Sequence, residues 1–169
     1  ALFVRPGTPI APIQFGAGHE GGLRPGTENV PHLVGLGAAA VLAQRHLPTI
    51  GDRLRRQRDA LHARLDSEIP GLALNGDLDE RLPNTLNLSF PGVSGRDLLA
   101  RTPEIAASVG SACHEEADAD SGVLGAMGVA QGRARGAVRL SLGAPTTDDD
   151  ISQAADALVA AWRALVRGR

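Results

Sequence analysis

The chain has 169 residues, a formal net charge of −2 and 43% hydrophobic residues, a composition typical of a globular fold. No apolar run approaches the ~20 residues that a membrane-spanning helix needs, and the nearly balanced charge gives no electrostatic basis for binding nucleic acid or an anionic membrane. The single cysteine excludes an internal disulfide framework. A single cysteine, without histidines at metal-ligand spacing, also excludes an iron–sulfur or zinc site. The low cysteine content favours a reducing, cytoplasmic compartment.

The chain opens with an apolar, strand-like run at residues 1–5. Neither an initiator methionine nor the charged and apolar regions of a signal peptide are present. We therefore expect that further sequence precedes this run in the natural protein.

Residues 1–30 are rich in glycine and proline and show no helical period, which predicts a strand followed by a loop and a tight turn. A helix is predicted from about Asn29 to His46, and Pro48 and Gly51 are expected to end it. The apolar residues of this helix are expected to point into a core: Leu33, Val34, Leu36, Ala40 and Val41.

A second helix is predicted from Asp52 to about Glu68. Leu54, Leu61 and Leu65 recur on one side of it at helical spacing, so that side should face a core. The other side is rich in arginine, and we expect it to be a solvated surface rather than a binding patch.

After residue 71 the pattern changes to short strands and helices. Strands are predicted at residues 72–74, 85–90, 105–108 and 137–142, and short helices after Ser94 and over residues 121–127. The final helix is expected to start in an acidic run capped by a threonine, where the helix dipole favours carboxylates, and to end at about Val166. Asn87, on an alternating strand, is expected to face solvent rather than take part in catalysis.

These patterns predict a small mixed α/β domain over residues 52–169. Residues 1–51 are interpreted as the tail of another domain together with a connecting helix.

Three motifs carry the chemistry of the chain. Residues 15–29 read FGAGHEGGLRPGTEN, residues 108–113 read SVGSAC, and residues 136–143 read GAVRLSLG. In this order they resemble the glycine-rich segment, the active-cysteine loop and the substrate-carboxylate strand of cysteine desulfurases of the NifS/IscS type, which are class V aminotransferases. The resemblance spans nearly the whole chain.

The resemblance implies a fold and a reaction. The fold would be the C-terminal portion of a transferase of fold type I that depends on pyridoxal 5'-phosphate (PLP): a small α/β domain with a mixed or antiparallel sheet flanked by helices, preceded by the tail of the large domain. The enzyme would convert L-cysteine to L-alanine, keep the sulfur as a persulfide and pass it to a sulfur-acceptor protein. A homodimer with shared sites is also implied. Iron–sulfur cluster assembly, tRNA thiolation and DNA phosphorothioation all stay open as destinations of the sulfur.

Cys113 is the candidate nucleophile, because a thiolate can take sulfur and hold it in a labile S–S bond. The alternative is a buried structural cysteine, but the acidic run that follows Cys113 favours an exposed loop. The resemblance implies that this loop moves between cofactor and sulfur acceptor. His114 departs from the family, which usually has Ser or Thr there, and is either a local proton acceptor or a neutral substitution.

Arg139 is the candidate for binding the substrate carboxylate, since a guanidinium matches a carboxylate bidentately and this charge interrupts an apolar strand. The alternative for Arg139 is a surface salt bridge. The resemblance assigns Thr27 to the cofactor phosphate of the neighbouring subunit, next to a helix start that favours anions. The alternative for Thr27 is a plain helix cap. Arg24 would support this loop or the substrate end of the site.

The chain contains no lysine: all 17 of its Lys and Arg residues are arginine. A PLP enzyme holds its cofactor through a lysine Schiff base, so this chain by itself is predicted to be inactive. Two alternatives to the desulfurase remain. One is a selenocysteine lyase, which shares the fold and the cysteine position, and the other is a non-catalytic persulfide carrier or binding domain.

Overall fold

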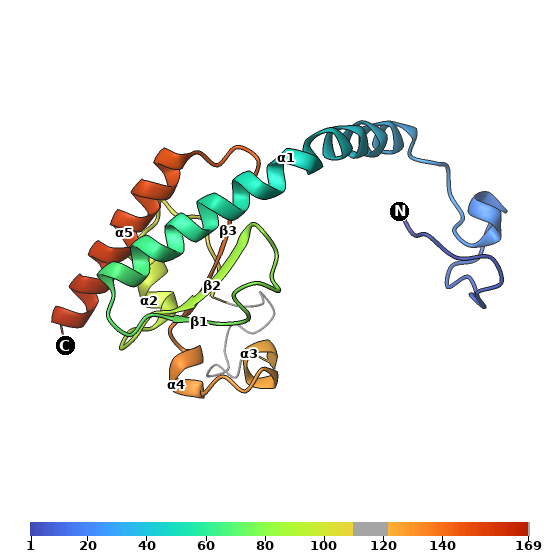
Figure 1. Ribbon diagram of the computed structural model, residues 1–169. Coiled ribbons are helices and arrows are strands. Elements are labelled where there is room, and N and C mark those ends of the chain that lie inside the picture. The colour runs from blue at the N-terminus through green and yellow to red at the C-terminus, as the bar shows by residue number, and fades with distance from the viewer. Residues whose placement is uncertain (110–121, 169) are drawn as a thin grey trace. The chain divides into compact units, whose positions relative to one another are not determined.

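The computed structural model describes residues 1–109 and 122–168 of the chain (Figure 1). The chain divides into two compact units, Ala1–His46 and Leu47–Arg169. No helix within the described ranges is long and apolar enough to cross a membrane. The expected boundary of the large domain, between residues 51 and 52, stays a prediction.

The N-terminal unit consists of an extended segment, the short 3-10 helix η1 (His19–Gly22) and the first part of α1 (Val30–Glu68). The strand expected at residues 1–5 is not formed. Because strand backbone needs a neighbouring strand for its hydrogen bonds, an apolar run without such a neighbour stays irregular. Asn29 caps α1, since its Oδ1 accepts a hydrogen bond from the backbone N–H of His32 at 3.3 Å.

The prediction of two helices separated at Pro48 and Gly51 was wrong, because α1 runs through both residues. A proline removes one helical N–H donor, and a glycine adds conformational freedom, but neither removes the hydrogen bonds of the flanking turns. The expected burial of the first part of the helix was wrong as well. Its apolar side chains are exposed in the N-terminal unit: Leu33 by 51%, Val34 by 67%, Leu36 by 50% and Val41 by 45%, with Ala40 also exposed. A helix buries an apolar stripe only against another element.

The C-terminal unit is built on an antiparallel sheet in the order β1 (Ala73–Leu74), β2 (Thr85–Ser89) and β3 (Ala137–Ser141). The other helices of this unit are α2 (Gly95–Ala100), α3 (Gly122–Ala126), α4 (Gln131–Ala134) and α5 (Asp148–Arg167) (Figure 1). The sequence patterns had predicted all of these elements except α4, and the observed mixed α/β architecture confirms the expected fold class at this level.

The core lies on one face of the sheet, where period-2 alternation directs the apolar residues of β2 and β3. Leu86, Leu88, Val138 and Leu140 pack there against α1, α2 and α5. The helical contributions include the predicted residues Leu61 and Leu65 of α1 and Ile151, Ala155 and Leu158 of α5, with Trp162 and Leu165 partly buried beside them. The opposite face, the polar face, carries Asn87, Ser89, Arg139 and Ser141, while Ala137 packs on it against Leu124 and Ala134.

The segment expected as a strand at residues 105–108 is not one. Ile105 closes a turn onto the carbonyl of Thr102, and only Ser108 pairs with the sheet, through a single antiparallel bridge to Arg139. Because the segment begins in the turn at Thr102–Ile105, only Ser108 at its other end reaches β3. The bridge nevertheless adds one residue to the sheet next to β3.

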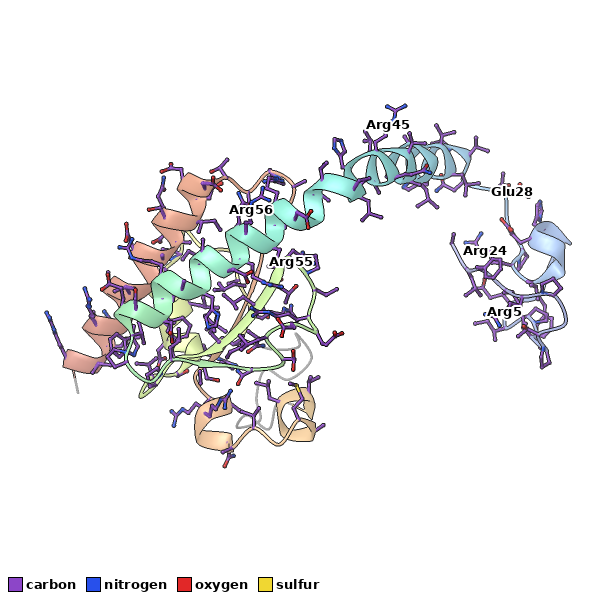
Figure 2. The ribbon with its side chains drawn as sticks, in the orientation of Figure 1. Arg5, Arg24, Glu28, Arg45, Arg55 and Arg56 are labelled. Carbon is purple, nitrogen blue, oxygen red and sulfur yellow. The ribbon has the colours of Figure 1, made fainter. Side chains whose placement is uncertain are left out.

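The arginine-rich side of α1 is solvated only in part. Arg55 and Arg56 are exposed, as expected, and both project from α1 in Figure 2. Arg58 is only 3% exposed and donates to the Asp59 carboxylate and the Leu82 carbonyl. A guanidinium carries five donors on a long apolar stem, so it can be buried where carbonyl and carboxylate oxygens receive them.

Candidate functional site

The polar face of the sheet carries Arg139, the predicted carboxylate ligand. In β3 its neighbours Val138 and Leu140 are buried, whereas the Arg139 side chain is exposed on the opposite face. No ion pair links it to another residue within ranges 1–109 and 122–168. The alternative interpretation, a surface salt bridge, therefore has no support among these residues, and the guanidinium is available to a ligand.

Arg139 is fixed on two sides by the sheet. It stands opposite Asn87 of β2, and on its other side it exchanges backbone hydrogen bonds with Ser108, of 2.7 Å and 3.2 Å. Ser108 precedes Cys113 by five residues in the sequence. The carboxylate candidate thus lies beside the chain segment that leads to the cysteine candidate.

A hydrogen-bonded network covers the neighbouring part of the polar face. Asn75 donates from Nδ2 to Asn87 Oδ1 at 2.9 Å and to Ser89 Oγ at 2.8 Å, and Arg133 Nε donates to Asn75 Oδ1 at 3.0 Å. Arg133 also donates to the carbonyl of Leu74. The expectation that Asn87 merely faces solvent was incomplete, because this residue is half-buried and hydrogen-bonded.

Sequence reasoning missed Asn75 and Arg133 as members of this face. The alternation of the strand over residues 85–90 placed Asn87 on the polar side, but no local pattern predicted that Arg133, 58 residues after Asn75, contacts it. Such a contact depends on how α4 packs beside β1.

Cys113 and His114 lie outside the described residues, as does the acidic run that follows them. Their roles as nucleophile and neighbouring base or neutral residue remain predictions from the sequence.

Thr27 and Arg24 belong to the N-terminal unit, where Figure 2 labels Arg24 and Glu28. Thr27 is exposed and is not the helix cap, a role that Asn29 fills. The N–H groups of Val30 and His32 are already engaged, by the Glu28 carbonyl and by Asn29 Oδ1. The predicted phosphate contacts were the Thr27 hydroxyl and the backbone N–H groups beside it. Of these groups, the Thr27 hydroxyl has no hydrogen bond to another described residue.

Arg24 lies against Gly26, whose φ of +110° is a conformation that favours glycine. A Cβ at position 26 would stand 3.2 Å from Arg24 Nη1. The predicted role of Arg24, in supporting the loop that carries Thr27 or the substrate end of the site, stays a prediction.

A hollow lies between α1 and the start of α5 in the C-terminal unit. Several of its polar groups are paired with one another, since Arg53 donates to the carbonyls of Ala144 at 2.7 Å and Thr146 at 2.8 Å. Gln57 donates to the Asp148 carboxylate at 2.8 Å. These contacts hold α1 against the start of α5, whereas Arg56, which also lines the hollow, is exposed. In the part of the chain that the structure describes, no cluster of His, Cys, Asp and Glu could hold a metal ion.

Comparison with known proteins gives a consistent family. The model of the aminotransferase class-V family matches residues 16–154. The chain is 43% identical to a selenocysteine lyase of Xenopus laevis, covering 85% of this chain and 35% of that protein. It is 41% identical to a cysteine desulfurase of Gluconacetobacter diazotrophicus, covering 94% of this chain and 40% of that protein.

The structure resembles a solved NifS-like protein with a TM-score of 0.81 and 32% sequence identity, over 97% of this chain and 41% of the other. The chain therefore spans 35–41% of the length of the relatives it matches.

Proposed function

Since this chain belongs to the aminotransferase class-V family, we propose that it is a portion of a cysteine desulfurase, equivalent to the small domain of a fold type I enzyme and the segment before it. The enzyme would convert L-cysteine to L-alanine and keep the sulfur as a persulfide on Cys113. The observation that carries the proposal is the position of Arg139. Its exposed guanidinium stands on the polar face of the sheet, bridged to the segment that leads to Cys113.

The two candidate residues Arg139 and Cys113 have separate tasks in the proposed reaction. Arg139 binds the carboxylate of L-cysteine and thereby orients its side-chain sulfur. The Cys113 thiolate attacks this sulfur, so that an S–S bond forms at Cys113 while the C–S bond of the substrate breaks. The substrate carbon takes up a proton and leaves as L-alanine. One thiol and one cysteine thus give one persulfide and one alanine.

The family is PLP-dependent, and the residues present fit part of a PLP site. When bound, PLP supplies an electron sink for the carbon atoms of an amino-acid substrate. The Thr27 hydroxyl, which has no hydrogen bond to a residue of the described ranges, suits a phosphate oxygen, whereas no side chain of this sequence can hold the cofactor as a Schiff base, because lysine is absent. The anchoring lysine must therefore belong to another part of the protein.

Further parts of the proposal concern partners. We infer a homodimer in which Thr27 of one subunit contacts the cofactor phosphate of its partner, and a separate acceptor protein that receives the sulfur in the cytoplasm. Iron–sulfur assembly, tRNA thiolation and DNA phosphorothioation are the candidate routes.

A selenocysteine lyase is the second candidate, favoured by the 43% identity to the Xenopus laevis enzyme. Both reactions use the same carboxylate contact, so Arg139 does not separate them. Rates of alanine formation from L-cysteine and from L-selenocysteine, measured on one preparation, decide between the two. Activity confined to L-selenocysteine would replace the desulfurase by the lyase.

The test of the main proposal is alanine formation from L-cysteine by the natural full-length protein. We expect activity in that protein, none in its Cys113→Ser variant and none in the isolated 169-residue chain, which has no lysine. Ser111→Ala serves as a control in the same segment and should keep activity. Full activity of Cys113→Ser, or a full-length protein that forms no alanine, would favour the alternative of a persulfide carrier or binding domain.

A further inference from the structure

The polar face of the sheet carries four residues in one cross-strand row. Asn87 pairs with Arg139 across β2 and β3, Ser108 bridges to the far side of Arg139, and the N–H of Asn75 donates to the carbonyl of Asn87 at 2.9 Å. The order across the sheet is therefore Asn75, Asn87, Arg139 and Ser108. Side chains in such a row share one face and contact their neighbours.

The pair of Asn87 and Arg139 is the closest type of cross-strand pair. In a strand, the N–H and C=O of one residue point to the same side, and those of Arg139 are both bonded to Ser108. The carbonyl of Asn87 likewise points to Asn75. Asn87 and Arg139 thus form a non-hydrogen-bonded pair, whose Cα atoms stand about 4.5 Å apart and whose side chains lie close together.

The orientation of the Asn87 amide follows from a chain of donors. Arg133 can only donate, so the atom of Asn75 that faces it, at 3.0 Å, is the oxygen. The NH2 group of Asn75 must then face Asn87 and Ser89, and the atom of Asn87 that accepts from it, at 2.9 Å, is again an oxygen. The NH2 group of Asn87 is left on the side away from Asn75, which is the side of Arg139.

The side chains of a directly opposed pair thus both offer donors on one face of the sheet, and no residue of ranges 1–109 and 122–168 supplies an acceptor to either donor. The Asn87 NH2 group has no hydrogen-bond partner within residues 1–109 and 122–168, and a guanidinium cannot accept a hydrogen bond from it. The same ranges hold no ion-pair partner for Arg139. An anion with two oxygens in one plane satisfies both donors, and the α-carboxylate of an amino acid is such an anion.

We propose that Asn87 is a second substrate-binding residue, which donates from Nδ2 to the same carboxylate that Arg139 binds. Arg133 and Asn75 are positioning residues, because they fix the direction in which the Asn87 amide donates. The inference rests on the proposed function, since it takes an amino acid as the substrate. In this proposal Asn87 binds the substrate carboxylate through a hydrogen bond of its own, in addition to the contact made by the Arg139 guanidinium.

The experiment uses the natural full-length protein and two competitive inhibitors of L-cysteine turnover. 3-Mercaptopropionate has the thiol and a carboxylate but no amine, whereas cysteamine has the thiol and an amine but no carboxylate. Asn87→Asp keeps the acceptor for Asn75 and replaces the donor by a negative charge. We expect it to raise the inhibition constant of 3-mercaptopropionate and the KM for L-cysteine by about 10- to 100-fold, the effect of a charge-assisted hydrogen bond. The inhibition constant of cysteamine and kcat should change by less than about threefold.

Asn87→Ala removes the donor without adding charge and should give a smaller change in the same direction, so the proposal does not depend on one variant. Ser141→Ala is the matched control, because Ser141 lies exposed on the same face of β3, two residues from Arg139. It should leave both inhibition constants unchanged. Thermal unfolding of each variant identifies a loss caused by misfolding.

The outcomes separate this inference from the function on which it rests. If Arg139→Gln weakens 3-mercaptopropionate and both Asn87 variants do not, or if the Asn87 variants weaken cysteamine equally, the role of Asn87 is wrong and the desulfurase proposal stands. If the unaltered full-length protein forms no alanine from L-cysteine, the proposed function itself has failed and the inference fails with it.

Discussion

Ser108 and Arg139 exchange two backbone hydrogen bonds: the Arg139 N–H donates to the Ser108 carbonyl at 2.7 Å, and the Ser108 N–H donates to the Arg139 carbonyl at 3.2 Å. This bridge fixes the backbone on both sides of the candidate carboxylate site. It also sets the point from which the chain continues toward Cys113.

Replacing Ser108 by proline removes the N–H donor of the bridge and leaves the Arg139 carbonyl without it. We expect the free energy of unfolding to fall by about 1–2 kcal/mol. In the full-length protein kcat/KM for L-cysteine should fall by about tenfold, equivalent to ~1.4 kcal/mol, because Arg139 is less well positioned. Ser108→Ala keeps the N–H and should lose less stability and activity than the proline variant. Equal loss in both variants would mean that the hydroxyl, not the bridge, matters.

Gly136 allows two backbones to touch. A Cβ there would collide with the Phe90 carbonyl, next to the 2.9 Å hydrogen bond from the Phe90 N–H to the Gly136 carbonyl. Gly136→Ala should therefore lower the free energy of unfolding by about 3 kcal/mol. Gly132→Ala, in α4 with nothing within 4 Å of its Cβ, should instead raise it by up to about 1 kcal/mol. Urea unfolding followed by the fluorescence of Trp162, the single tryptophan, measures both.

The capping box of α5 gives a prediction with a pH dependence. The Thr147 N–H and hydroxyl both donate to the Asp150 carboxylate at 2.8 Å and hold the pKa of Asp150 below its ordinary value. A carboxyl with a lowered folded-state pKa contributes stability above its unfolded-state pKa, near 4. That contribution is lost as pH falls through the folded-state value. Asp150→Asn should thus be less stable than the unaltered chain at pH 7, and the difference should vanish at acidic pH.

Thr147→Ala removes the other half of the same box and should lower the free energy of unfolding by about 1 kcal/mol at pH 7. Thr147→Ser keeps the hydroxyl and serves as the control. Urea titrations of the three variants, at pH 7 and again below pH 3, test both expectations. A gap between Asp150→Asn and the unaltered chain that persists in acid would contradict the carboxylate role.

His62 gives a second pH-dependent contribution to stability, near neutral rather than acidic pH. Burial, followed by the charge of Arg81, lowers the pKa of His62 below its ordinary value of about 6.5. The unfolded chain therefore binds more protons than the folded chain just below that value, so stability rises with pH through this window and falls on acidification. His62→Gln should flatten the change in urea midpoint between pH 7 and pH 5. An unchanged slope would show that another group causes it.

How much of this protein could be read from the sequence depends on the range of the interaction. Period-2 alternation predicted β2, and the threonine followed by aspartates predicted the start of α5, because these signals lie within a few neighbouring residues. The continuation of α1 through Pro48 and the irregular run at residues 105–108 were missed. In the first case the hydrogen bonds of the flanking turns continue the helix through the proline, and in the second a turn onto Thr102 and the bridge from Ser108 to Arg139 decide the backbone.

The sequence by itself determined the family and the candidate residues Cys113, Arg139 and Thr27, because each follows from residue identity and order. Only the tertiary structure decided that Asn87 stands beside Arg139 and that Arg133 reaches Asn75 from α4. Strand register and helix packing bring these groups together across 58 residues of sequence, and their donors and acceptors acquire a direction only when that packing is complete.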